Sequence, residues 1–189
     1  MALIESLGYD KAFVFGVSMG SYVALQAAVL DSSKIDKLVL VVTKGYGSTS
    51  SFATKLKEQG IDPYSIPIEQ MQSGLATNEM LWAPETPMAL RELEEKNARP
   101  TTLTGEQRKA VDTALLGFDL RPGCPFVNCP TLICQGKYDK LNPLSAGQEV
   151  ASLIPNSTLK IFEHSGHLIY VEEPELLYKT VVEFLSKKD

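Results

Sequence analysis

Short apolar runs alternate with longer amphipathic stretches along this chain of 189 residues. The apolar runs have the length of strands and are rich in β-branched and aromatic residues, whereas the stretches between them carry apolar residues at helical spacing. Strands that alternate with helices pair in parallel through right-handed crossovers. The pattern therefore predicts an α/β fold, a parallel sheet with flanking helices. Strands are expected at 12–15, 38–42, 131–135 and 158–162, and helices at 22–30, 144–154 and 174–185, with the end of another helix at 1–9.

A long middle region departs from this pattern. Residues 44–129 are polar, rich in Ser, Thr, Glu and Pro, and contain no strong strand signal. This composition predicts a helical cap inserted into an α/β core that consists of residues 1–43 and 130–189. Within the cap, helices are expected at 51–59, 68–76, 88–97 and 105–116.

The pentapeptide Gly16-Val17-Ser18-Met19-Gly20 lies between the first predicted strand and the first predicted helix. A sharp strand-to-helix turn of this kind lifts a serine Oγ clear of its surroundings, and it requires neighbours with little or no side chain. Ser18 is therefore the candidate nucleophile. The N–H of Met19, at the helix N-terminus, is the candidate donor to an oxyanion. The alternative is an ordinary tight turn in an α/β domain.

A serine nucleophile needs a base, and the chain contains only two histidines, His164 and His167. His167 follows a glycine in a connection that leads to Pro174, which is well placed to open the last helix. Catalytic groups of parallel sheets collect on such strand-to-helix connections. The sequence therefore favours His167 as the base and gives His164 a structural or pocket-wall role.

The orienting acid is expected between the serine and the histidine, because the chain order of this motif class is Ser, then acid, then His. Asp139 follows the third predicted strand, on a loop at the same edge of the sheet. Its carboxylate would accept the Nδ1 hydrogen of His167. Glu163 and Glu172 are the alternative acids, and a solvated loop aspartate is the plainer interpretation of Asp139.

Three separated segments carry a resemblance to a known family: the elbow around Ser18, residues 130–143, and residues 165–167 followed by 173–174. In their order and spacing they resemble the α/β-hydrolases, in particular the smaller cap-bearing serine esterases, lactonases and peptidase-like members. The resemblance implies a Ser-His-Asp triad that hydrolyses a carboxylic ester or related acyl bond of a small molecule through an acyl-enzyme intermediate. It also implies that no metal and no organic cofactor take part.

The same resemblance assigns a role to the predicted cap. In this family the cap roofs the active site and shapes the choice of substrate. Met71, Trp82 and Leu116 are therefore the candidate substrate-binding residues. The alternative for each of them is that it only packs the cap against the core.

The chain also departs from the family pattern, because Ser18 lies close to Met1 whereas similar enzymes place several strands ahead of the elbow. We therefore expect no source for the second oxyanion donor and an open sheet edge at residues 12–15. Open apolar edges recruit another strand, so the expected partner is a second copy of the chain or a complementing chain. The alternative function is a catalytically impaired fragment that acts as an interaction or oligomerisation module.

Composition narrows the function further. The net charge is −5 and 44% of the residues are hydrophobic. No basic patch indicates a nucleic-acid partner, and neither a secretory leader nor an apolar stretch of about 20 residues indicates a membrane. Cys124, Cys129 and Cys134 lack a metal-ligand pattern and are expected to be free thiols in a reducing cytoplasm.

Overall fold

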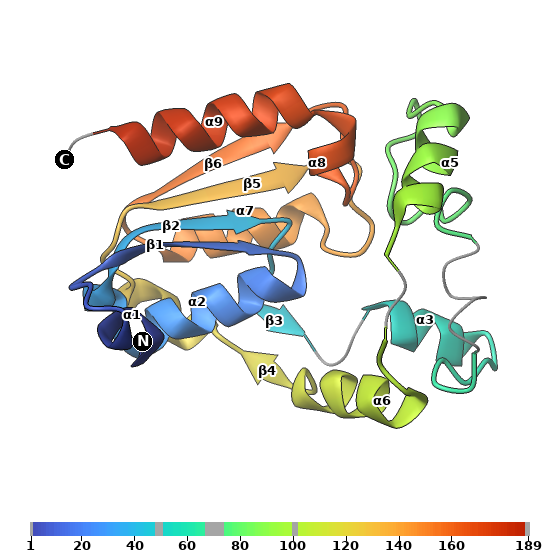
Figure 1. Cartoon of the computed structure of the whole chain (residues 1–189), viewed down its shortest axis with the longest axis horizontal. Helices are drawn as coiled ribbons and strands as arrows, with labels where there is room; N and C mark the ends of the chain where they lie inside the picture. Colours follow the sequence, from blue (N-terminus) through green and yellow to red (C-terminus); the bar gives the residue numbers. More distant parts are fainter. Residues whose placement is uncertain (1, 48–50, 67–73, 100–101, 188–189) are drawn as a thin grey trace.

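The computed structural model describes residues 2–47, 51–66, 74–99 and 102–187. Its core is a parallel sheet of four strands in the order β1-β2-β5-β6 (Figure 1). The strands are β1 (Ala12–Val17), β2 (Ile35–Val41), β5 (Thr131–Gly136) and β6 (Ser157–Phe162). All four lie where the apolar runs predict strands, and the predicted α/β fold class is confirmed.

Helices cover both faces of this sheet (Figure 1). They are α1 (Ala2–Ser6), α2 (Met19–Asp31), α7 (Leu144–Leu153), α8 (Ile169–Glu172) and α9 (Pro174–Ser186), with 3-10 turns η1 (Ser32–Lys34) and η2 (Arg121–Phe126). Side chains alternate between the faces of a strand, so in β2 Leu38 and Leu40 pack toward α2 and α7, whereas Val39 and Val41 pack toward α9. No helix in the described part of the chain is both long and apolar enough to cross a bilayer.

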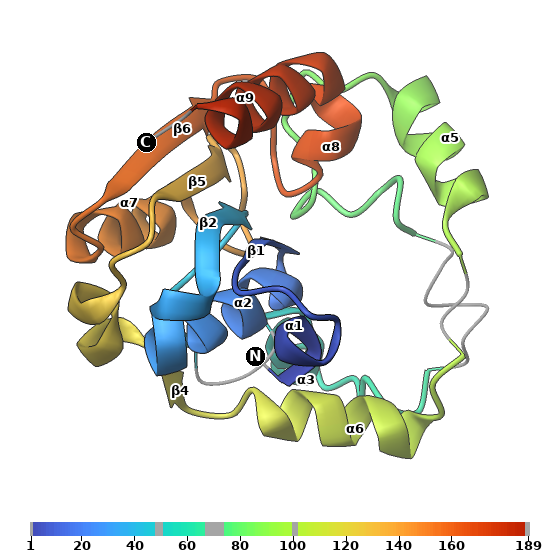
Figure 2. The ribbon, with the colours of Figure 1, turned by 60° about the vertical axis from the view of Figure 1, so that its left-hand side comes forward.

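The region between β2 and β5 is largely helical. Its described elements are β3 (Tyr46–Gly47), α3 (Ser51–Glu58), α5 (Met88–Asn97), α6 (Gly105–Ala114) and β4 (Phe118–Asp119). The helices predicted at 51–59, 88–97 and 105–116 are confirmed, whereas most of the one predicted at 68–76 lies outside the described residues. α5 and α6 stand apart from the sheet in both views (Figures 1 and 2).

This region rejoins the core before β5. β3 and β4 pair antiparallel, so the two ends of the region lie side by side. Leu120, Cys124, Val127 and Cys129 then pack into the core on the side of α2 and α7. The last part of the range 44–129 therefore contributes to the core, and the division into core and cap stays a prediction.

β1 forms one edge of the four-stranded sheet. Phe13 and Phe15 are 52% and 51% exposed, whereas Val14 between them packs against the core. β1 therefore buries one face and leaves its two aromatic side chains half open to solvent.

Candidate active site

The turn between β1 and α2 has the strained geometry expected of a nucleophile elbow. Ser18 has φ 50° and ψ −120°, a positive φ that is uncommon for a residue with a side chain. Gly16 is required beside it, because a Cβ there would lie 2.3 Å from the carbonyl oxygen of Gly20. A Cβ on Gly20 would meet no atom within 4 Å. The expectation that the turn has no room for a side chain is therefore right for Gly16 and wrong for Gly20.

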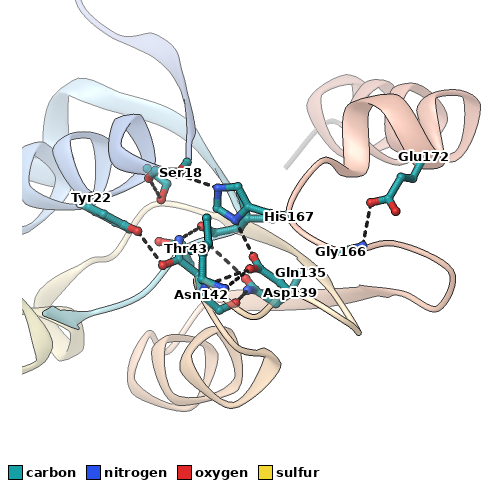
Figure 3. Close-up of polar contacts among 12 residues, drawn as sticks. Ser18, Tyr22, Thr43, Gln135, Asp139, Asn142, Gly166, His167 and Glu172 are labelled. Carbon is teal, nitrogen blue, oxygen red and sulfur yellow. Dashed lines mark hydrogen bonds and ion pairs between the residues drawn. The ribbon is translucent and has the colours of Figure 1, made fainter. Parts of the chain in front are cut away.

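Ser18, His167 and Asp139 form one hydrogen-bonded chain (Figure 3). The Oγ of Ser18 lies 2.9 Å from Nε2 of His167, and Nδ1 of His167 lies 2.8 Å from Oδ2 of Asp139. The three side chains follow the carboxyl ends of β1, β6 and β5, which the parallel sheet brings to one edge. Because an ionised carboxylate only accepts hydrogen bonds, we assign Nδ1 as the donor to Asp139, which leaves Nε2 to accept from the Ser18 hydroxyl.

The second carboxylate oxygen of Asp139 is also held. Oδ1 accepts the backbone N–H of Leu141 at 2.8 Å and that of Asn142 at 2.9 Å. Asp139 is only 4% exposed, and it cannot rotate without losing one of these partners. The loop after β5 therefore aims this carboxylate at His167.

Asn142 ties the same loop to α2, the helix that follows Ser18, a contact that sequence analysis missed. Its Nδ2 donates to the carbonyl oxygen of Val42 at 2.6 Å, and its Oδ1 accepts from the hydroxyl of Tyr22 at 2.8 Å (Figure 3). Tyr22 lies one turn of α2 beyond Ser18. The only sequence signal for this contact is slight: a tyrosine shortly after Ser18 and an asparagine shortly after Asp139.

A sequence model of the alpha/beta hydrolase fold family matches residues 2–174. The chain belongs to the α/β-hydrolase family. This hydrolase is 29% identical, over 97% of its length, to a protein of Caulobacter sp. (strain K31) provisionally named carbamate hydrolase RutD, of which it covers 69%. It is 27% identical, over 94% of its length, to the pimeloyl-[acyl-carrier protein] methyl ester esterase of Vibrio vulnificus (strain CMCP6), of which it covers 71%.

Among solved structures, the hydrolase resembles an esterase from Exiguobacterium antarcticum, with 26% identity and a TM-score of 0.76 over 98% of this chain and 70% of that one. The relatives named here are all called hydrolases or esterases. The predicted family and the predicted enzyme class, a hydrolase, are both confirmed by these matches.

The environment of Tyr22 keeps its hydroxyl a neutral donor. Burial raises the pKa of Tyr22 to about 12, against the smaller opposite effect of its hydrogen bond with Asn142. The ring stacks on Phe118 with 5.1 Å between centroids, and the Lys44 ammonium lies 5.4 Å from the ring centroid. Burial lowers the pKa of Lys44, and the nearby charge of Asp139 partly opposes this. The ring of Tyr22 thus lies between two neighbours, and its hydroxyl is protonated at neutral pH.

The alternative base and acids lie outside the hydrogen-bonded chain of Ser18, His167 and Asp139. The side chain of His164 is 74% exposed. Glu163 forms an ion pair with Lys137 at 2.7 Å, and the hydrogen bond from this ammonium holds the pKa of Glu163 below its usual range. Glu172 accepts hydrogen bonds from backbone N–H groups. The geometry therefore favours the base and acid that the sequence placed first.

The predicted substrate-binding residues fall in three different settings. Met71 lies outside the described residues. Trp82 is 1% exposed and its indole N–H donates to the carbonyl of Leu75 at 2.7 Å, so it offers almost no surface to a ligand. Leu116 is 64% exposed, just after α6. Their contact with a substrate stays a prediction.

The three cysteines of the hydrolase are free and buried. Burial raises the pKa of Cys124 to about 11 and that of Cys134 to about 12, so both thiols are protonated at neutral pH. Within the described ranges, no group of three or more His, Cys, Asp or Glu side chains is arranged to hold a metal ion.

Proposed function

We propose that this hydrolase cleaves a carboxylic ester or a related acyl bond of a small molecule through a Ser-His-Asp triad. The observation that supports the proposal most directly is the hydrogen-bonded chain from Ser18 through His167 to Asp139. The strained turn raises Ser18 at the end of β1, with a base 2.9 Å from its hydroxyl oxygen. These are the conditions under which a serine hydroxyl becomes a nucleophile.

The reaction runs in two halves. Nε2 of His167 takes the Ser18 proton as Oγ attacks the acyl carbon, and the carbonyl electron pair moves onto oxygen. When the tetrahedral intermediate collapses, the protonated His167 gives its proton to the departing alkoxide, which leaves an acyl-enzyme. Water, deprotonated by His167, then attacks the acyl carbon, and the acid leaves as Ser18 regains its proton. Asp139 holds the Nδ1 hydrogen and stabilises the imidazolium in both halves.

The N–H of Met19 is the proposed donor to the oxyanion. α2 begins at Met19, and the first N–H groups of a helix have no carbonyl partner within the helix. Donors at this position favour the negative charge that develops on the carbonyl oxygen. The intermediate is therefore stabilised from the same turn that presents Ser18.

An ester is the substrate class that we propose first. The Vibrio vulnificus relative is named as a methyl ester esterase, and the Caulobacter relative is provisionally named as a carbamate hydrolase. Both bonds join an acyl carbon to a heteroatom, which suits attack by a serine oxygen. Lactone, thioester, amide and carbon–carbon bonds are the alternatives.

Labelling with a fluorophosphonate probe tests the proposal. Wild type is expected to become labelled at Ser18, and both Ser18→Ala and His167→Ala are expected to abolish labelling. His164→Ala is the matched control and should label normally, because His164 lies outside the hydrogen-bonded chain. Equal labelling of wild type and His167→Ala would refute an activated serine. A panel of short and medium acyl p-nitrophenyl esters then measures turnover.

The proposed chemistry requires no cofactor, because the nucleophile, base, acid and oxyanion donor all belong to the chain. We also propose a cytoplasmic location. The buried free thiols of Cys124, Cys129 and Cys134 support it, since a reducing compartment preserves such thiols.

A second candidate function is assembly through β1. We propose that a second copy of the chain packs against the exposed aromatic side chains of this edge strand, Phe13 and Phe15. Exposed apolar positions on an edge strand favour pairing or packing by another strand. There are two other outcomes. A separate complementing chain would be recognised by the mass of the complex, and a protein that serves only as an interaction module would be recognised by its lack of activity.

A further inference from the structure

The carboxylate of Glu172 joins two segments that are far apart in the sequence. Its Oε2 accepts the backbone N–H of Gly166, next to His167, at 2.7 Å (Figure 3). Its Oε1 accepts the backbone N–H of Ala83 at 2.7 Å and also the hydroxyl of Thr86. One side chain thus binds the loop of the predicted base with one oxygen and the region between β2 and β5 with the other.

Direct backbone contacts reinforce this junction. The N–H of His167 donates to the carbonyl oxygen of Leu81 at 2.7 Å. Gly166 lies so close that a Cβ on it would be 2.5 Å from the same carbonyl oxygen and 2.7 Å from the carbonyl carbon of Trp82. The backbone on which His167 stands is therefore packed against residues 81–83 with no space for movement toward them.

The segment that makes these contacts, residues 81–86, is itself rigidly held. Arg91 of α5 donates from Nη2 to the carbonyl of Ala83 at 2.9 Å and from Nε to the carbonyl of Thr86 at 3.0 Å. Its guanidinium lies 5.8 Å from the ring centroid of Trp82, whose side chain is buried. Residues 81–86 therefore present fixed partners to Glu172 and to the histidine loop.

We propose that Glu172 is a positioning residue that clamps residues 81–86 onto the loop of His167 and so sets the distance between His167 and Ser18. This inference rests on the proposed role of His167 as base. It assigns to Glu172, an alternative acid in the sequence, a role through the backbone of Gly166 and not through the imidazole. Under this proposal, the region between β2 and β5 helps to hold His167 in place.

Glu172→Gln tests the clamp with almost no change in volume. The amide has one oxygen and one NH₂ group, so it can accept from the N–H of Gly166 or from that of Ala83 but not from both. In either orientation one of these N–H groups faces the NH₂ group, and one side of the clamp is lost. With p-nitrophenyl butyrate we expect kcat to fall by about 10- to 100-fold, the range that misplacement of a catalytic group by an ångström produces. KM should change by less than about twofold, because the clamp does not touch substrate. Glu175→Gln, on the exposed first turn of α9, is the matched control and should leave both constants unchanged.

Thr86→Val breaks the clamp from the other side. It removes only the hydroxyl donor to Oε1 of Glu172, which keeps the N–H of Ala83. We therefore expect kcat to fall by about threefold to tenfold, less than the full effect of losing a hydrogen bond to a charged group. This variant decides the question if Glu172→Gln does not fold. Unchanged kcat in Thr86→Val, or a fall in melting temperature of either variant with kcat intact, would show that the clamp is only structural.

A spectroscopic measurement separates this inference from the proposed function. In the wild-type protein, the proton between Nδ1 of His167 and Asp139 is expected to give a far-downfield NMR signal. Glu172→Gln should shift or broaden that signal, and Glu175→Gln should not. The signal does not depend on turnover, so the clamp is tested even if the fluorophosphonate probe fails to label Ser18. An unchanged signal in Glu172→Gln would overturn the clamp and leave the proposed hydrolysis standing.

Discussion

Ser18 is held in place by different means from His167 and Asp139, the other two members of the hydrogen-bonded chain. Ser18 is fixed by its own stretch of backbone, through its positive φ and the close approach of Gly16 to the carbonyl of Gly20. Asp139 and His167 stand on loops that are aimed by hydrogen bonds from groups elsewhere in the fold. The proposed nucleophile, held by backbone geometry, tolerates no change of backbone, whereas the proposed acid and base, held by polar contacts, depend on particular side chains.

The largest expected effect on turnover is at Asp139, one of the two residues held by polar contacts. Asp139→Asn should cut turnover by orders of magnitude, about 10⁴-fold in the best-studied triad, because an amide favours the wrong tautomer of His167. The fold should survive, since the asparagine oxygen can still accept the two N–H groups that Oδ1 now accepts. Circular dichroism and melting curves check the fold, and ester hydrolysis checks the rate. Unfolding of this variant would make Asp139 a structural residue, and an unchanged rate would move the acid role to another carboxylate.

Two glycines of the turn test whether close backbone packing holds Ser18 in place. Gly16→Ala brings a Cβ within 2.3 Å of the Gly20 carbonyl, so strand and helix must separate. We expect a loss of stability of about 1–3 kcal/mol and a fall in Ser18 labelling of about 100-fold.

Gly20→Ala is the control, since its Cβ would meet open space. It should label normally and gain at most about 0.5 kcal/mol of stability, because Gly20 is the second residue of α2 and the preference for alanine is largest in a helix interior. Thermal unfolding and probe labelling of both variants measure the contrast. If the two alanine variants behaved alike, close packing at Gly16 would not be what fixes Ser18.

The same contrast explains what could be predicted from the sequence. The strands follow from their apolar runs, and Ser18 follows from a motif whose geometry is local to a few residues. Asp139 and His167 could be chosen by their chain order and their place after a strand. The contacts of Glu172 could not be predicted, because its partners Ala83 and Thr86 are far away in the sequence and no local periodicity encodes such a contact.

The orientation of a single side chain is hard to predict from sequence for a related reason. Trp82 is large and apolar in a region expected to roof the site, yet whether such a residue faces a ligand or the interior depends on packing. Here it is buried and hydrogen-bonded to the carbonyl of Leu75. Asn142 likewise offered no local pattern for its bonds to Tyr22 and Val42, which depend on how β2, β5 and α2 meet.

A smaller effect on activity is expected at Asn142, which links the loop of Asp139 to the helix that follows Ser18. Tyr22→Phe removes one neutral hydrogen bond, with a net value of about 1 kcal/mol or a factor of about five in rate. Asn142→Ala removes two such bonds and should cost about tenfold or more. Tyr9→Phe, at a residue that is 64% exposed, is the control and should have no effect. Ester hydrolysis and melting temperature are measured together, and a loss of stability with full activity would show that Asn142 does not position the acid.

The smallest effect on activity is expected at the edge strand β1, which leads into Ser18. Phe13 and Phe15 are half exposed, and Val14 anchors the strand between them. The double substitution Phe13→Ser and Phe15→Ser should therefore leave Ser18 labelling within about twofold, because surface substitutions away from buried contacts change stability by only about 0.5 kcal/mol. It should, however, remove the apolar surface on which we propose that a second copy packs.

Multi-angle light scattering is expected to give a dimer for wild type at micromolar concentrations and a monomer for the double variant. Tyr178→Ser, which removes a 72% exposed aromatic from α9, should remain a dimer. A wild-type monomer across this range would contradict the assembly, and a heavier complex that contains a different chain would replace the second copy as the occupant of this edge.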